Sequence, residues 1–203
     1  MNKKIVILAN SRKLSGKCVA GKDEDGEWIR LTKNGHNPIP VIEARNYYML
    51  KIIEAEGLIN TSSTEFNYHT ENSIYTNVKL LGNLDLSKID NLTDNPIDIF
   101  GTGKYVIEED AQNLNQSLIF VKVTNFSMYY KHSGQYGDKL RGQFTYKKKN
   151  YSDMAVTDTF CEERFALRGS NYQESYRQVY ITVSLGEIFN GAAYKLISGV
   201  VIP

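Results

Sequence analysis

Short apolar runs separated by turn residues dominate this sequence, and they restrict the chain to a fold rich in β-strands. No segment longer than about ten residues has a clean 3.6-residue period, and the best helix candidates are short, at 108–115 and 159–167. Many short strands with turns between them predict β-barrels or sandwiches. The strand-like runs are residues 4–10, 17–22, 27–31, 47–56, 74–82, 117–130, 139–146, 149–158, 179–185 and 194–203.

The stretch 83–113 differs from the sequence on either side of it. It is rich in loop-forming residues and acidic, with seven carboxylates against two lysines. With this connection assigned to the first half, each half of the chain has roughly 90 to 110 residues, which suits one small barrel. The sequence therefore predicts a first barrel over residues 1–112, which includes the acidic connection, and a second barrel over residues 113–203.

The composition is that of an ordinary globular protein. The 203 residues carry a net charge of +1, so a nucleic-acid surface would require local segregation of charge. Cys18 and Cys161 lie far apart, which argues against a disulfide and suits a reducing cytoplasm. No apolar run approaches the length of a membrane span, and the run near the start is too short for a signal peptide. We therefore expect a cytoplasmic protein that makes no membrane contact.

Residues 10–18, NSRKLSGKC, place three cations among small polar residues directly after an apolar run. A loop that leaves a strand can direct backbone N–H groups and hydroxyls at an anion, and a guanidinium matches the shape of a phosphate. We therefore predict an anion-binding loop, with Arg30 reaching the same face from the third run. A solvated loop whose cations balance the acidic residues 23–27 is the alternative. The residues assigned to the loop site are Ser11, Arg12, Lys13 and Lys17.

A second basic segment, residues 129–151, mixes cations with aromatic rings. It contains six lysines or arginines and one carboxylate, Asp138. Cations hold the backbone of a single-stranded nucleic acid, and rings stack on its bases for about 1–3 kcal/mol each. A hairpin that carries lysines on an exposed edge is the alternative. The residues assigned to this second site are Lys139, Arg141, Tyr146 and Tyr151.

Patterns that would indicate catalysis are weak. His36, His69 and His132 show no spacing typical of metal ligands. The segment HTEN (69–72) could form a catalytic base or a base-reading site, but a polar loop is the simpler interpretation. Asp158 most simply caps the helix predicted at 159–167. We predict no cofactor and no metal, and we expect a binding protein rather than an enzyme.

Four segments carry a resemblance to a known family: ILANSRKLSGKCVAGK with GEWIRL, HTEN, LRGQFTYKKKNYSDMAVTD, and YITVSLGEIFNGAAYKLISGVVIP. Together they resemble the prokaryotic family called the dual OB-containing domain, over almost the whole chain. The resemblance implies two OB-type barrels in one compact unit, binding of a nucleic acid or nucleotide, and a link to bacterial defence against phage. The ligand contacts that it implies are Ser11, Arg12, Lys13, Lys17, Arg30, Arg141 and Asp158.

These observations favour a non-enzymatic module for single-stranded RNA or DNA, acting as an accessory or sensing component of a bacterial anti-phage system. Three alternatives stay open. The protein could sense a small phosphorylated nucleotide, it could be a protein-interaction subunit of a defence complex, or it could be a nuclease or other hydrolase.

Overall fold

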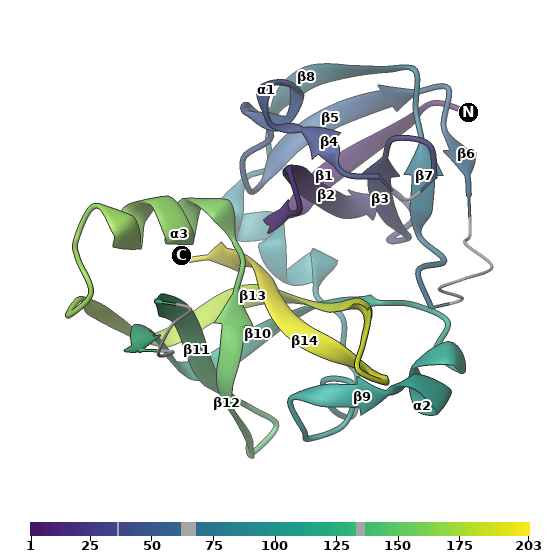
Figure 1. The fold of residues 1–203 in the computed structure, drawn as a ribbon. Helices are drawn as coiled ribbons and strands as arrows, with labels where there is room; N and C mark the ends of the chain where they lie inside the picture. Colours follow the sequence, from purple (N-terminus) through teal and green to yellow (C-terminus); the bar gives the residue numbers. More distant parts are fainter. Residues whose placement is uncertain (36, 62–67, 133–136) are drawn as a thin grey trace.

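The computed structural model describes residues 1–35, 37–61, 68–132 and 137–203, so His36 lies outside the described residues (Figure 1). The chain is mostly β, with a few short helices, as the sequence predicted. It forms a curled sheet that resembles half a barrel and a closed barrel of five strands. Among the described residues, no helix is long and apolar enough to cross a membrane.

The first sheet has eight strands and curls without closing. Its main order is β6-β7-β3-β2-β1-β5-β8, and β4 pairs with β2, just before the short helix α1 (Val41–Ala44). Aliphatic side chains such as Ile5, Ile7 and Ile53 fill its concave side. The strands are β1 (Lys3–Lys13), β2 (Gly16–Asp23), β3 (Trp28–Thr32), β4 (Ile39–Pro40), β5 (Lys51–Glu56), β6 (Ile59–Asn60), β7 (Asn72–Ile74) and β8 (Asn77–Asn83).

The second sheet closes into a barrel. Its order is β12-β11-β10-β13-β14, and a parallel pairing of β12 with β14 completes the ring. This closed five-stranded arrangement, with helix α3 (Thr159–Ala166) between its third and fourth strands, is that of an OB fold. The short strand β9 extends the sheet beyond β14. The strands are β9 (Tyr105–Ile107), β10 (Leu118–His132), β11 (Asp138–Tyr146), β12 (Lys149–Val156), β13 (Gln173–Phe189) and β14 (Ala192–Val201).

The acidic connection between the halves contains the short helical elements η1 (Leu86–Leu92) and α2 (Glu108–Gln112). The predicted strand at 74–82 is interrupted, because β7 ends at Ile74 and β8 begins at Asn77. The predicted helix after β12 is confirmed as α3. The carboxylate of Asp158 accepts a hydrogen bond from the backbone N–H of Cys161 and so caps this helix, as predicted.

The prediction of a loop over residues 10–18 is wrong. β1 continues to Lys13 and β2 begins at Gly16, so the segment is a β-hairpin with a two-residue turn. The first turn residue, Leu14, has a positive φ of 47°, as two-residue hairpin turns require. Ser, Gly and Lys are common in both loops and hairpin ends, and their presence concealed the strand pairing.

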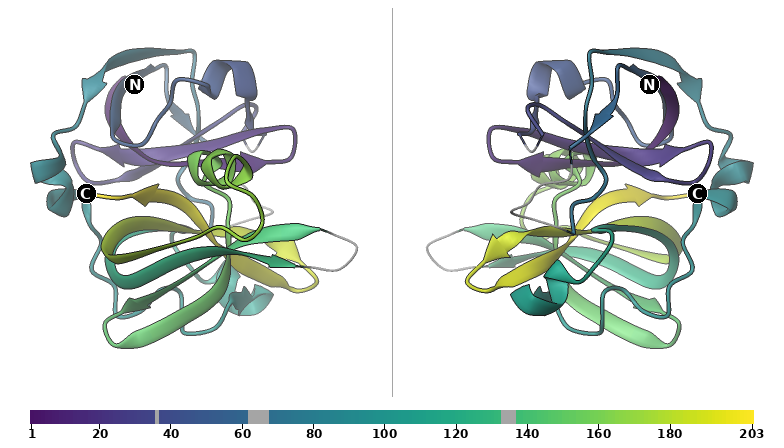
Figure 2. Two further views of the ribbon diagram at one scale, coloured as in Figure 1. Left: turned by 90° about the vertical axis from the view of Figure 1, so that its left-hand side faces the viewer. Right: turned by 90° about the vertical axis from the view of Figure 1, so that its right-hand side faces the viewer.

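The two sheets pack directly on each other, with α3 at their junction (Figure 2). In β14, a Cβ added at Gly199 would lie 2.7 Å from Cε of Met49 and still closer to the carbonyl oxygen of Leu8. The hydroxyl of Thr182 in β13 donates a hydrogen bond to that same carbonyl. The backbones of β1 and the barrel therefore approach as closely as a glycine allows, and the two sheets form one packed unit.

Candidate nucleic-acid interface

Strand alternation places one side of each barrel strand in the core and the other at the surface. In β11, Leu140 and Phe144 fill the barrel, whereas Lys139 and Arg141 point outward. Directly opposite residues of paired strands share a face, and β10 places Tyr129 opposite Arg141 and Lys131 opposite Lys139. We call Lys104, Tyr129, Lys131, Lys139 and Arg141 the cationic face.

One carboxylate sits among three cations of this face. Asp153 of β12 forms ion pairs with Lys104 and Lys131, at 2.7 Å each, and lies 3.7 Å from Nε of Arg141. Hydrogen bonds from Lys104 and Lys131 lower the pKa of Asp153, so it is ionised at neutral pH. Three positive charges against one negative charge leave an excess of two in this cluster.

Within the described part of the chain, Nε of Arg141 makes no hydrogen bond. The guanidinium of Arg141 is therefore held in place by its neighbours without being fully satisfied by them. A cluster with excess positive charge is suited to a phosphate.

A cavity of about 300 Å³ brings together three of the residues predicted from sequence: Arg12, Lys139 and Arg141. Arg12 reaches this cavity because the β1–β2 hairpin packs against the end of β12. There the backbone N–H of Arg12 donates a hydrogen bond to the carbonyl of Thr157 at 2.9 Å. Its guanidinium forms an ion pair with Glu162 of α3 at 3.1 Å. The hairpin and β11 thus line one continuous depression, to which Asp138 and Glu162 contribute negative charges.

A second cavity, of about 190 Å³, is lined by Ser11, Lys13, Arg30 and His69, among others. Lys13 forms an ion pair with Glu187 at 2.8 Å. Ser11 is buried, and Lys17 is half-buried opposite Arg12 on β2. Lys17 lines a third cavity, of about 140 Å³, so the cations predicted near residues 10–18 do not share one site.

The two tyrosines predicted to stack on bases lie in the barrel core. Tyr146 and Tyr151 are only 6% and 2% exposed. The hydroxyl of Tyr146 donates to the carbonyl of Pro96, and that of Tyr151 accepts from the N–H of Ile99. Asp158 is also buried, and its second carboxylate oxygen accepts from the N–H of Val200. In this structure these three side chains support the barrel and do not reach its surface.

Arg30 lies in a buried polar network that joins the two sheets. Its Nη2 atom is 2.8 Å from a carboxylate oxygen of Glu71 and donates to the hydroxyl of Ser117 at 2.7 Å. Ser117 also donates to Glu71, and Nη1 of Arg30 donates to Asn72 at 3.4 Å. Two residues of the HTEN segment therefore hold Arg30 at the junction, where the sequence suggested a polar loop.

His69, the first residue of HTEN, is buried in the same region. Its Nε2 lies 3.3 Å from the carbonyl oxygen of Leu185. Burial, with the nearby charges of Arg30 and Lys13, lowers the pKa of His69 to about 2. His69 is therefore neutral at physiological pH and is a structural residue of the junction.

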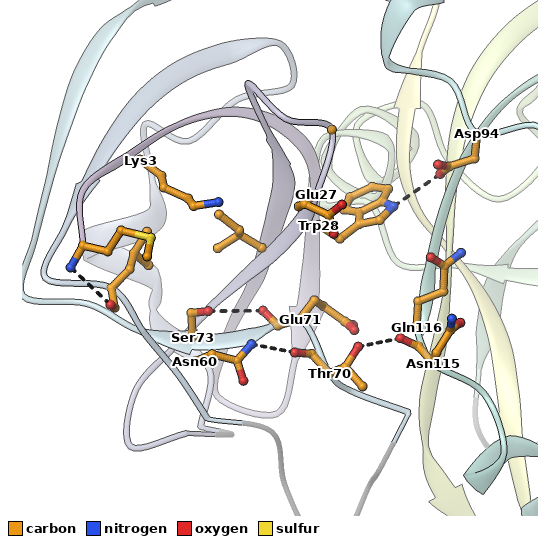
Figure 3. Close-up of a pocket in the computed structure, with 14 residues that line it drawn as sticks. Lys3, Glu27, Trp28, Asn60, Thr70, Glu71, Ser73, Asp94, Asn115 and Gln116 are labelled. Carbon is orange, nitrogen blue, oxygen red and sulfur yellow. Dashed lines mark hydrogen bonds between the residues drawn. The ribbon is translucent and has the colours of Figure 1, made fainter.

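A larger cavity, of about 440 Å³, lies beside this network (Figure 3). Its lining includes three carboxylates, those of Glu27, Glu71 and Asp94. The positively charged side chain in the lining is that of Lys3. Asp94 accepts a hydrogen bond from the indole of Trp28 at 3.3 Å. The excess of carboxylates disfavours a phosphate group, so this cavity is a poor candidate for binding a nucleic-acid backbone.

Three members of the cationic face were not assigned from sequence: Lys104, Tyr129 and Lys131. Tyr129 and Lys131 share the outward side of the hairpin with Arg141, so strand alternation and register would have identified them. Lys104 lies in the acidic connection, and its place depends on the pairing of β9 with β14. In the described ranges, no group of three or more His, Cys, Asp or Glu residues could hold a metal ion.

Comparison with known families agrees with this architecture. The model of a family described as the dual OB-containing domain matches residues 3–200. No curated protein matches the chain.

Proposed function

Because the chain belongs to the family of dual OB-containing domains, we propose that it binds single-stranded RNA or DNA across the outer face of β10, β11 and β12. OB folds commonly bind oligonucleotides on the face of their second and third strands, which are β11 and β12 in this barrel. The observation that carries the proposal is the excess positive charge around Asp153, next to Lys139 and Tyr129.

The geometry supports a simple division of roles. Arg141, Lys131 and Lys139 contact phosphates, and the ring of Tyr129 offers a surface for a base. The cavity shared with Arg12 extends the path toward the β1–β2 hairpin. Contacts with three or four phosphates correspond to a slope of about −2 to −3 in a plot of log affinity against log salt concentration. The small net charge of the chain is compatible with this proposal because the cationic face carries a local excess of positive charge.

We extend the proposal to the biological setting implied by the family resemblance. In this setting the protein is an accessory or sensing component of a bacterial anti-phage system, and a protein partner joins it in a defence complex. A cytoplasmic location is also part of the proposal, and the free thiols of Cys18 and Cys161 are consistent with it.

A sensor of a small phosphorylated nucleotide is the second candidate. The cavity of about 190 Å³ supports it, because Arg12, Lys13 and Arg30 contribute to the lining. However, Lys13 is paired with Glu187, and Arg30 is paired with Glu71. These pairs neutralise much of the positive charge, so the cationic face is the better anion site.

Fluorescence anisotropy with labelled oligo(U) and oligo(dT) of about 20 nucleotides tests the proposal. The wild-type protein should bind at low salt and lose affinity as salt rises. Arg141→Glu and Lys131→Glu should each weaken binding by roughly tenfold or more, since each replaces an attraction to phosphate with a repulsion.

Lys4→Glu is the matched control, because Lys4 is an exposed lysine of the first sheet that pairs only loosely with Glu24, at 3.6 Å. It should bind like the wild type. Absence of binding by the wild type at low salt would refute the function, and wild-type affinity in both face variants would refute the site.

A further inference from the structure

Exposed aromatic rings gather at the tip formed by β13, β14 and β9. Phe189 is 66% exposed, Tyr105 is 51% exposed and Tyr194 is 42% exposed. Tyr194 is directly opposite Tyr105, and Ala192 lies between Phe189 and Ile107 in adjacent strands. Because alternate residues of a strand share a face, all these side chains stand on the same side of the sheet. We call Tyr105, Tyr194 and Phe189 the aromatic platform.

The fold does not use these rings for its core. The opposite side of the same strands carries Val106, Ala193 and Ile188, which pack with Tyr68 and Leu185 in a buried cluster. The rings of Tyr105 and Tyr194 lie 5.6 Å apart and are tilted by 52°. They contact each other and remain open to solvent. An exposed apolar group of this kind commonly marks an interaction site.

The platform is continuous with the cationic face. Lys104 directly precedes Tyr105 and forms an ion pair with Asp153. The parallel pairing aligns Ala155 of β12 with Leu196 of β14. The ion pair of Lys104 with Asp153 therefore places the platform next to the cluster that contains Arg141.

We propose that the aromatic platform stacks bases of the same single strand whose phosphates contact the cationic face. This inference rests on the proposed function. Rings next to a row of cations have the composition of a single-stranded nucleic-acid site, and a stacked base contributes roughly 5- to 150-fold in affinity. The positive charge next to Tyr105 therefore favours a nucleic acid over a purely apolar protein partner.

Negative charge on the far side of the platform sets the end of the bound nucleic-acid strand. Beyond Ile107, the first turn of α2 carries Glu108, Glu109 and Asp110. These carboxylates repel phosphates, so the bound strand runs from the Arg12 cavity across Arg141 and terminates at the platform.

The double variant Tyr105→Ala with Tyr194→Ala tests the inference, with the same labelled oligonucleotides. We expect its affinity to fall by roughly tenfold or more, with an unchanged salt slope because the phosphate contacts remain. Tyr105→Phe with Tyr194→Phe keeps the rings and should retain nearly full affinity. Tyr48→Ala is the matched control, since it removes an equally exposed ring that lies 4.9 Å from another aromatic ring, that of Phe160.

An oligonucleotide with abasic sites in place of its bases at one end completes the test. It should bind the wild type more weakly than the intact strand does, and the alanine variant should bind both strands equally. If the alanine variant binds the intact strand as tightly as the wild type while Arg141→Glu still weakens binding, the inference is refuted and the proposed function stands. If the wild type binds neither strand, the proposed function itself fails.

Discussion

Replacing Glu71 with alanine should strongly destabilise the folded protein, because the change leaves the positive charge of Arg30 buried without a carboxylate. Arg30 and Glu71 are each only 4% exposed. The Glu71 carboxylate forms an ion pair with Arg30 and accepts a hydrogen bond from Ser117, which lies at the start of the barrel sequence and also accepts a hydrogen bond from Arg30. This network therefore joins β3 of the curled sheet to the closed barrel.

The expected magnitude follows from this burial. Removing one partner of a buried ion pair costs about 3–5 kcal/mol, because the remaining charge stays in a poorly solvated site. Replacing both partners, with Arg30→Met and Glu71→Leu, removes both charges and should cost far less than the sum of the two single changes. This non-additivity of the two substitutions would assign most of the lost stability to the uncompensated charge rather than to lost packing.

Equilibrium urea unfolding provides the assay, with fluorescence of Trp28 as the signal. Trp28 is the single tryptophan and lies in the junction, so its emission reports on the contact between the sheets. Lys4→Ala is the control, because its exposed pair with Glu24 should contribute little. A loss below about 1 kcal/mol for Glu71→Ala, or strict additivity in the double variant, would refute the reasoning.

Two further predictions concern the same junction. Burial holds the pKa of His69 at about 2, below its ordinary value of 6.5. The contribution of His69 to the free energy of unfolding is therefore complete above pH 6.5. It is lost as the pH falls below 6.5, by about 1.4 kcal/mol per pH unit. His69→Gln should remove that part of the pH dependence of urea unfolding between about pH 6.5 and 5. Gly199→Ala should lower the free energy of unfolding by about 1–3 kcal/mol, because its Cβ would force β14 away from Leu8. Gly82→Ala, where the added Cβ meets open space, should be neutral in the same urea titration, and equal stability of the two glycine variants would contradict the close approach.

Most of the strands could be predicted from sequence, because alternation and turn residues are local signals. The cap at Asp158 and helix α3 were predictable for the same reason. The interior positions of Tyr146 and Tyr151 do not follow from the abundance of cations and rings in this segment, because composition does not say which side of a strand a residue occupies. In β11, Tyr146 lies on the same side as Phe144, and Arg141 lies on the other side. Tyr151 of β12 is opposite Phe144 and therefore shares the inner side. Inward and outward positions thus follow from alternation once the strand is anchored.

Long-range pairing set the rest of the site, and no local pattern reveals it. Lys104 joins Arg141 because β9 adds to β14 and β14 closes the ring with β12. Arg30 is buried because β3 pairs in parallel with β7, which brings Glu71 and Asn72 beside it. Both arrangements connect segments that lie far apart in the sequence.

The closing strand has a consequence for how the protein is made. β14 follows every other strand in the chain, yet it pairs with β9, β12 and β13 and touches β1 through Gly199. Until β14 has emerged from the ribosome, the growing chain exposes the unpaired edges of β12 and β13, which are prone to associate with other chains. Tyr194 is carried on this same strand, so a nascent chain can complete the aromatic platform only after β14 has been synthesised.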